Sequence, residues 1–233
     1  MQRTNALGLG IGALALVASS AFAAPLFITN ASFEDPVVAD GGYTGNTNPG
    51  WSGSTFGTQN PTSSLFTGAT GNALPGTATG DNDGYLNTAA NTNPFAVQSD
   101  LVLVSNGGLS ATIADNTTYT LTVAIGKRSD YPNSNAKIEI LSNLASATAT
   151  TILAADQPVG TFSDFTATFT TAPSGDPRVG TNLRVQITAT SPDGGLSQLN
   201  FDNVRLDAAA VPEPAAMSLL GFGGISLLAR RRR

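Results

Sequence analysis

The two-residue alternation of apolar and polar side chains in the middle of the chain constrains the fold most. In residues 119–125 (YTLTVAI), Tyr, Leu, Val and Ile share one face while two Thr and an Ala share the other. The same period recurs at 183–187 and, after a slip, at 162–169. A period of two is typical of a half-buried β-strand and does not fit an amphipathic helix.

The rest of the body repeats this pattern in short segments. Clusters of Gly, Asn, Asp and Pro, such as 106–108 and 193–195, predict turns between them. No helical periodicity interrupts the series, so we expect an all-β domain over residues 24–209, an antiparallel, jelly-roll-like β-sandwich. Further strands are expected at 26–29, 85–88, 96–104, 137–141, 150–153 and 199–206.

Residues 40–82 differ from the rest of the body. They are rich in Gly, Asn, Thr and Ser and contain the single Trp, Trp51. We expect long ordered loops over one face or rim of the sandwich, with two short strands among them. Long loops on a rigid sandwich are common binding sites. Flexible decoration without a ligand is the alternative.

The chain contains no His and no Cys. Thiol proteases, Ser-His-Asp hydrolases and Cys/His zinc sites are therefore excluded. Carboxylate chemistry, binding of hard cations through oxygen, or no catalysis remain. Residues 24–211 contain fifteen acidic and six basic residues, a net charge of −9. Because such a surface repels phosphate backbones, we expect no nucleic-acid partner.

The N-terminus has the layout of a secretory signal peptide. Residues 1–23 contain one cation, Arg3, an apolar stretch at 7–18, and the small-residue ending Ala21-Phe22-Ala23. This pattern predicts cleavage by signal peptidase after Ala23, and hence export. A buried N-terminal helix is the alternative.

The C-terminus, residues 210–233, has three unlike parts in sequence. The motif Pro212-Glu213-Pro214 precedes an uncharged apolar stretch at 215–229, and four arginines end the chain. The stretch predicts one hydrophobic helix of about 22 Å at 1.5 Å per residue, short for a bilayer unless the arginines snorkel. The arginines would stay cytoplasmic, with the body outside. A core helix with a basic tail is the alternative.

This tail resembles the PEP-CTERM sorting signal. The resemblance implies a substrate of exosortase that is anchored transiently in the cytoplasmic membrane and then delivered to the cell envelope or extracellular matrix. The residues that carry it are Pro212, Glu213, Pro214, Arg230, Arg231, Arg232 and Arg233.

The body also resembles galactose-binding-like jelly-roll modules, many of which bind carbohydrate. The segments that carry the resemblance are 30–36 (NASFEDP), Gly50-Trp51 and 200–206 (NFDNVRL). The resemblance implies one structural calcium ion, with Glu34 and Asp202 as ligands. Calcium takes six to eight oxygens, so backbone carbonyls would have to complete the shell.

Aromatic and cationic side chains are the candidate ligand contacts. Trp51 and Tyr131 are the first candidates for stacking on a sugar ring, ahead of Tyr43, Tyr85 and Phe95. Lys127 and Arg128 follow a strand and stand beside an Asp and a Tyr, a loop suited to a hydroxylated or acidic polymer. The alternative for the aromatic residues is that they only fill the core or the loops. The alternative for the loop with Lys127 and Arg128 is a solvated loop without a ligand.

Three functions remain open. The first is binding of extracellular polysaccharide without catalysis, which is our expectation, so we predict no enzyme. The second is a structural matrix or surface protein without a sugar site. The third is a carboxylate-based glycoside hydrolase, which needs two positioned carboxyl groups that the sequence alone does not place.

Overall fold

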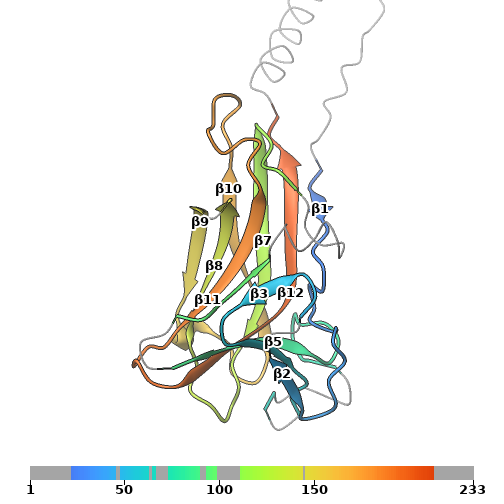
Figure 1. The fold of residues 1–233 in the computed structure, drawn as a ribbon, viewed down its shortest axis with the longest axis vertical. Coiled ribbons are helices and arrows are strands. Elements are labelled where there is room, and N and C mark those ends of the chain that lie inside the picture. Colours follow the sequence, from blue (N-terminus) through green and yellow to red (C-terminus); the bar gives the residue numbers. More distant parts are fainter. Residues whose placement is uncertain are drawn as a thin grey trace, which may run out of the picture. The chain divides into compact units, whose positions relative to one another are not determined.

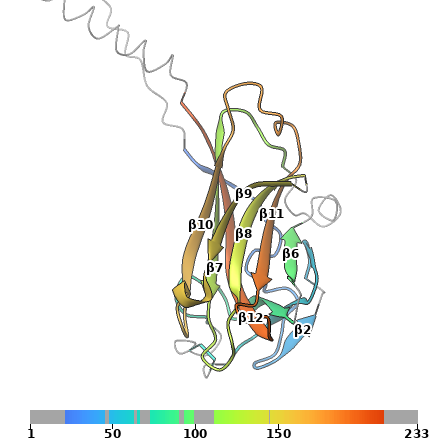
Figure 2. The same ribbon diagram turned by 90° about the vertical axis from the view of Figure 1, so that its left-hand side faces the viewer.

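The computed structural model describes residues 22–45, 48–62, 65–66, 73–89, 93–98, 111–143 and 145–212. Within them, Phe22–Val211 belongs to one compact unit. Two antiparallel sheets pack face to face in that unit, as Figures 1 and 2 show. The prediction of an all-β sandwich is confirmed.

The first sheet has seven strands and the second has five. In spatial order, the first contains β10 (Phe162–Thr170), β7 (Thr117–Gly126), β12 (Ser197–Ala210), β5 (Asp83–Thr88), β4 (Phe56–Gln59) and β2 (Tyr43–Gly45), with β1 (Ala24–Leu26) paired to β12. The second contains β3 (Trp51–Gly53), β6 (Phe95–Gln98), β11 (Leu183–Thr190), β8 (Asn135–Ser142) and β9 (Ala145–Ile152). A 3-10 turn, η1 (Ala154–Asp156), follows β9.

The alternation seen in the sequence separates the two faces of the first sheet. Leu121, Val123 and Ile125 on β7 are fully buried between the sheets. Thr120 and Thr122 on the same strand are only partly buried and face away from that core. Hydrophobic burial on one face therefore fixes the register of β7 against β10 and β12.

Aromatic rings fill the core near the start of the chain. The ring of Phe33 is fully buried, 5.3 Å from Trp51 and 5.2 Å from Phe201 between centroids. Phe56 contacts all three rings at 6.1 to 6.5 Å. The segment before β2 is thus tied to both sheets by aromatic packing.

Two expectations differ from the structure in detail. The first strand covers Ala24–Leu26 instead of 26–29, because Leu26 pairs with Leu206 of β12 and the chain then turns at Thr29. In its described residues, the glycine-rich stretch 40–82 holds three short strands, β2, β3 and β4, where we expected two. β2 pairs with β4 inside the stretch, whereas β3 pairs with β6 and β4 also pairs with β5 outside it, which local sequence does not reveal.

Strand β12 connects the two ends of the body. Its first residues pair with β5, and its last residues pair with β1 and with the start of β7. It runs from the end of the sandwich that carries β2 and β5 to the end where β1 begins (Figure 1). At about 3.3 Å per residue, its 14 residues span roughly 45 Å.

Candidate functional site

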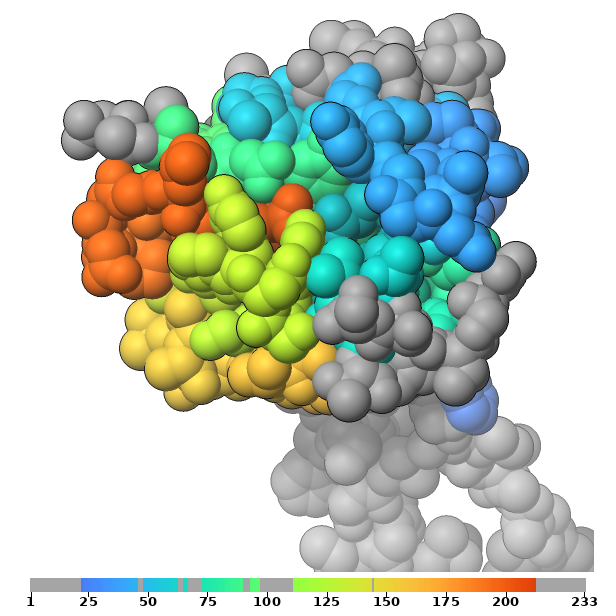
Figure 3. All heavy atoms as spheres, turned by 90° about the horizontal axis from the view of Figure 1, so that it is seen from below, coloured from blue at the N-terminus to red at the C-terminus, as the bar shows by residue number. Residues whose placement is uncertain are grey.

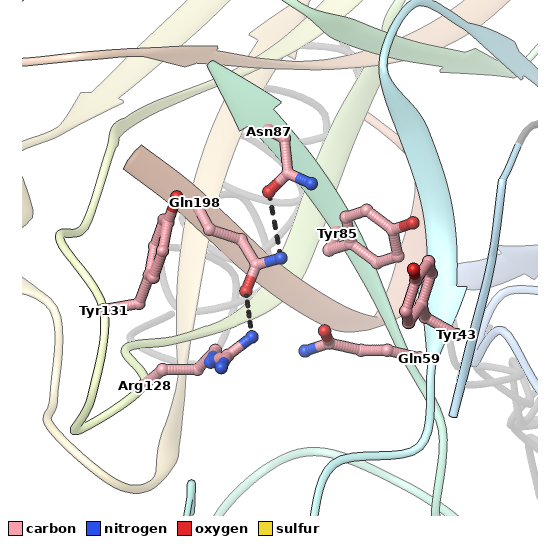
Figure 4. A pocket seen from close by; sticks show the side chains of 7 residues that line it. All are labelled: Tyr43, Gln59, Tyr85, Asn87, Arg128, Tyr131 and Gln198. Carbon is pink, nitrogen blue, oxygen red and sulfur yellow. Dashed lines mark hydrogen bonds between the residues drawn. The ribbon is translucent and has the colours of Figure 1, made fainter. Parts of the chain in front are cut away.

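A cavity of about 330 Å³ opens at the end of the body that carries β2 and β5. We call it the tyrosine pocket; Figure 4 shows its side chains. Four strands and the loop after β7 contribute to it, so its residues are far apart in the sequence. They are Tyr43 on β2, Gln59 on β4, Tyr85 and Asn87 on β5, Arg128 and Tyr131 in the loop, and Gln198 on β12.

Strand register brings these residues together. Tyr43 lies opposite Gln59 across β2 and β4, and Asn87 lies opposite Gln198 across β5 and β12. Tyr85 is two residues from Asn87, so both point to the same face of β5. Figure 3 shows this end from below. The lime surface of the loop after β7 lies next to a teal surface, which in turn adjoins the blue surface around β2.

Hydrogen bonds join the polar side chains of the pocket into a chain. The Arg128 guanidinium donates from Nη1 to Gln198 Oε1 at 2.9 Å, and Gln198 Nε2 donates to Asn87 Oδ1 at 3.0 Å. Arg128 also forms a two-pronged ion pair with Asp130, at 2.9 and 2.8 Å. Arg128 is thereby held in one orientation.

Two exposed tyrosine rings form walls of the pocket. Tyr43 is 77% exposed and Tyr131 is 38% exposed. The guanidinium carbon of Arg128 lies 5.7 Å from the centroid of the Tyr131 ring, within range of a cation–π contact. Tyr85 is buried, and its hydroxyl donates to the Thr44 carbonyl at 3.0 Å.

The predicted ligand contacts divide into two groups. Arg128 and Tyr131 line the pocket, as do the secondary candidates Tyr43 and Tyr85. Lys127 does not line it: its backbone N–H donates to Pro158 at 3.0 Å, and its carbonyl accepts from Gly160 at 2.7 Å.

Trp51 requires a correction. Its side chain is only 6% exposed and packs in the core, and its indole N–H donates to the carbonyls of Thr29 and Asn30 at 3.1 and 3.2 Å. It therefore has no open ring face for a sugar. In a glycine-rich stretch without a two-residue alternation, the sequence does not indicate whether a large aromatic side chain faces the core or the solvent.

The amide side chains of the pocket, Gln59, Asn87 and Gln198, were missed by the sequence analysis. Each is an ordinary polar residue in a strand, and only the register between strands places them on one surface. The single local signal is that Asn87 and Gln198 occupy outward positions next to buried Leu86 and Leu199.

A buried acidic group lies behind the pocket. The Asp83 carboxyl is fully buried, and its Oδ2 accepts from Asn200 Nδ2 at 2.8 Å and from Gln59 Nε2 at 3.4 Å. Burial raises the pKa of Asp83 well above its usual value, and these two hydrogen bonds oppose the rise. Gln59 thus connects the pocket to a buried carboxyl group whose pKa is raised by burial.

The predicted calcium ligands, Glu34 and Asp202, meet at the segment 79–82. Asp202 Oδ2 accepts from the backbone N–H of Thr79 at 2.5 Å, and Glu34 Oε1 accepts from that of Asn82 at 3.2 Å. Burial is the largest cause that raises the pKa of Asp202, and nearby Asp83 and Glu34 raise it further. Burial and Asp81 raise the pKa of Glu34 to about 7.

The free oxygens in this region fit a hard cation. Within the described part of the chain, seven buried side-chain oxygens have no hydrogen-bond partner. Three are threonine hydroxyls, and four are amide or carboxylate oxygens that can only accept: Oδ1 of Asn82, Asp83, Asn200 and Asp202. Carboxylate and amide oxygens are what calcium prefers. No group of three or more carboxylates among the described residues is arranged to hold a metal, so a cation here would also need amide or backbone oxygens.

The ends of the chain lie mostly outside the described residues. Of the sorting residues, only Pro212 is described, and the predicted signal peptide (1–23) is described only from Phe22. The predicted helix at 215–229 lies outside as well. In the described ranges, no helix is both long enough and apolar enough to span a membrane.

Comparison with known proteins gives matches for both the C-terminal segment and the body of the chain. Residues 210–233 match the PEP-CTERM protein-sorting motif, which implies processing by exosortase, export and sorting to the cell surface. No curated protein matches the chain.

Several solved structures similar to this chain are cyclases. An apo cyclase from Fischerella sp. is 24% identical, with a TM-score of 0.65, over 82% of this chain and 98% of the other. The Stig cyclase Fisc from Fischerella sp. TAU, bound to (3Z)-3-(1-methyl-2-pyrrolidinylidene)-3H-indole, is 23% identical at a TM-score of 0.65 over 82% of this chain and all of its own.

A further cyclase from Fischerella sp. TAU, bound to 4-(1H-indol-3-yl)butan-2-one, is 23% identical at a TM-score of 0.61, over 82% of this chain and 100% of its own. At these identities the likeness establishes the fold. Residues 24–207, most of the chain, match the family model described as HpiC1 cyclase, and the chain therefore belongs to the HpiC1-like family.

Proposed function

We propose that this exported protein binds extracellular polysaccharide at the tyrosine pocket without catalysing a reaction. The observation that carries the proposal is the pairing of two exposed tyrosine rings, Tyr43 and Tyr131, with a floor of amide side chains. The C–H face of a sugar ring packs on an aromatic plane, while amides and a guanidinium exchange hydrogen bonds with its hydroxyls.

The chemistry of the lining supports binding over catalysis. The side chains that line the pocket are tyrosines, amides and one arginine. The neighbouring carboxylates are occupied otherwise, because Asp130 pairs with Arg128 and Asp83 lies behind Gln59. General acid–base catalysis requires a carboxyl group within hydrogen-bond reach of the substrate.

We also propose that one calcium ion stabilises the fold behind the pocket. Glu34 and Asp202 would hold it, joined by the unpartnered amide oxygens of Asn82 and Asn200. A cation there would neutralise a group of carboxyl groups that burial otherwise drives toward protonation. Its role is structural, since it would link the first turn of the body to β5 and β12.

The binding experiment uses exopolysaccharide of the producing bacterium, immobilised, and the exported protein. We expect saturable retention that weakens about fivefold in Tyr131→Ala, since ring stacking contributes about 1 kcal/mol beyond buried area. Tyr131→Phe keeps the ring and should retain most of the affinity. Phe27→Ala, which removes a 68% exposed ring outside the pocket, is the matched control.

A structural matrix protein is the other outcome of this experiment. Absence of retention on the native polymer and on a glycan array would rule out the binding proposal. Equal loss of retention in Tyr131→Ala and Phe27→Ala would show that the protein binds the polymer nonspecifically through exposed aromatic rings and not at the pocket.

Acid-catalysed cyclisation is the second candidate function. It is favoured by the family and by the buried Asp83, whose pKa is raised and whose carboxyl contacts Gln59 of the pocket. Titration with 4-(1H-indol-3-yl)butan-2-one, the compound bound to one similar cyclase, separates the candidates. Saturable binding of this indole, with no retention on polysaccharide, would favour a small-molecule cyclase.

A further inference from the structure

The body ends in a clamp between Val211 and Asn116. The Val211 N–H donates to the Asn116 carbonyl at 2.7 Å, and Asn116 Nδ2 donates to the Val211 carbonyl at 2.6 Å. Both polar groups of the Val211 backbone are therefore occupied. The clamp continues the pairing of β12 with β7, whose last matched residues are Ala210 and Thr117.

Asn116 is itself fixed in place. Its own N–H donates to the carbonyl of Ala172 beyond β10 at 3.0 Å, so three segments meet at this residue. Its φ of 44° lies in the left-handed region, which Asn tolerates better than most residues. The geometry that presents Nδ2 to Val211 thus depends on an asparagine at this position.

The sequence disfavours further strand beyond the clamp. Pro212 and Pro214 have no N–H to donate, and proline in sheets is confined to edge strands, strand ends and bulges. Val211 is half-buried, whereas Pro212 is exposed. The boundary between the hydrogen-bonded backbone and the sorting motif therefore falls between adjacent residues, with no linker.

A protease must take several residues of its substrate into its cleft, out of any sheet they belong to. Backbone that is buried and hydrogen-bonded is cut only after local opening. We propose that the Asn116 clamp sets the upstream limit for proteolytic removal of the sorting tail, so that the cut falls beyond Val211 and the released body retains this residue.

The cut itself is an ordinary acyl transfer. The peptide C–N bond breaks, the nucleophile (water, or the amine of an acceptor) bonds to the carbonyl carbon, and the departing nitrogen takes up a proton as the new α-amino group of the tail. The inference rests on the sorting motif and the clamp and is independent of any ligand at the tyrosine pocket.

The first test examines the natural product. The full chain is expressed in the producing bacterium, and the intact mass of the surface protein gives its last residue. We expect Val211 or a later residue. A body that ends inside β12 would overturn the proposal.

The second test opens the clamp. Asn116→Asp keeps the size and left-handed tolerance of the side chain but sets an acceptor against the Val211 carbonyl. Thermolysin, which cuts before aliphatic residues, then probes the Ala210–Val211 bond in the purified full chain. We expect about a tenfold faster cut at this bond, because proteolysis follows the population of the opened state.

Asn143→Asp is the matched control. Asn143 also has a left-handed φ, of 55°, and contacts Asn182, but it lies in the turn between β8 and β9. This variant should leave the cut at Ala210–Val211 unchanged. If Asn116→Asp and Asn143→Asp behave alike, or if neither changes the rate, the clamp has no protective role.

Discussion

At the scale of single residues, the aromatic cluster around Phe33 should dominate stability. Phe33→Ala would leave a cavity between Trp51, Phe56 and Phe201, and we expect a loss of about 3–5 kcal/mol. Denaturant unfolding measures it. Tyr43→Ala, which truncates a 77% exposed ring, should change stability by less than about 0.5 kcal/mol.

The buried carboxyl groups predict a pH dependence of stability in the presence of chelator. The pKa of Glu34 in the folded chain is about 7, above its value of 4.5 in the unfolded chain, mainly because of burial. The folded chain therefore binds more protons between these values, and stability falls as pH rises from about 4.5 to 7. The raised pKa values of Asp83 and Asp202 act in the same direction.

Thermal unfolding with chelator, at pH 5 and at pH 7.5, checks the sign. We expect the higher melting temperature at pH 5, and a smaller difference in Glu34→Gln because this side chain no longer titrates. A melting temperature that rises toward pH 7.5 in the chelated protein would contradict the proposed environment of Glu34.

At the scale of strands, close approach between β4 and β5 depends on a glycine. A Cβ added to Gly57 would lie 2.0 Å from the Thr44 carbonyl oxygen and 2.6 Å from the Tyr85 ring. Gly57→Ala should therefore displace β2 or Tyr85, lower stability by about 1–3 kcal/mol and weaken binding at the pocket. Gly195→Ala meets nothing within 4 Å and is the control. Denaturant unfolding of both variants gives the comparison.

Local sequence predicted the long strands well because one of their faces is apolar. Residues 119–125 and 183–187 alternate cleanly, and both lie within strands, β7 and β11. The pocket could be predicted only in part. The loop with Arg128 and Tyr131 was identified from its composition, whereas Gln198 joins it through the pairing of β12 with β5, more than a hundred positions away in the chain.

At the scale of the whole molecule, the calcium proposal predicts stabilisation by mass action. Free calcium at 100 times its dissociation constant would stabilise the folded chain by about 2.7 kcal/mol. Differential scanning calorimetry with calcium and with chelator measures the shift in melting temperature. Asp202→Asn should reduce the shift, and identical curves under both conditions would exclude the ion.

Strand β12 carries Gln198 of the pocket near its beginning and leads to Val211 at the other end of the body. A polymer held at the pocket while the chain is held beyond Val211 would pull along this strand. Its ladder with β7 would then be loaded in shear, so that many hydrogen bonds resist the force together and do not unzip one at a time. If the proposed polymer binding holds, tension between the pocket and a point beyond Val211 would therefore run lengthwise along β12.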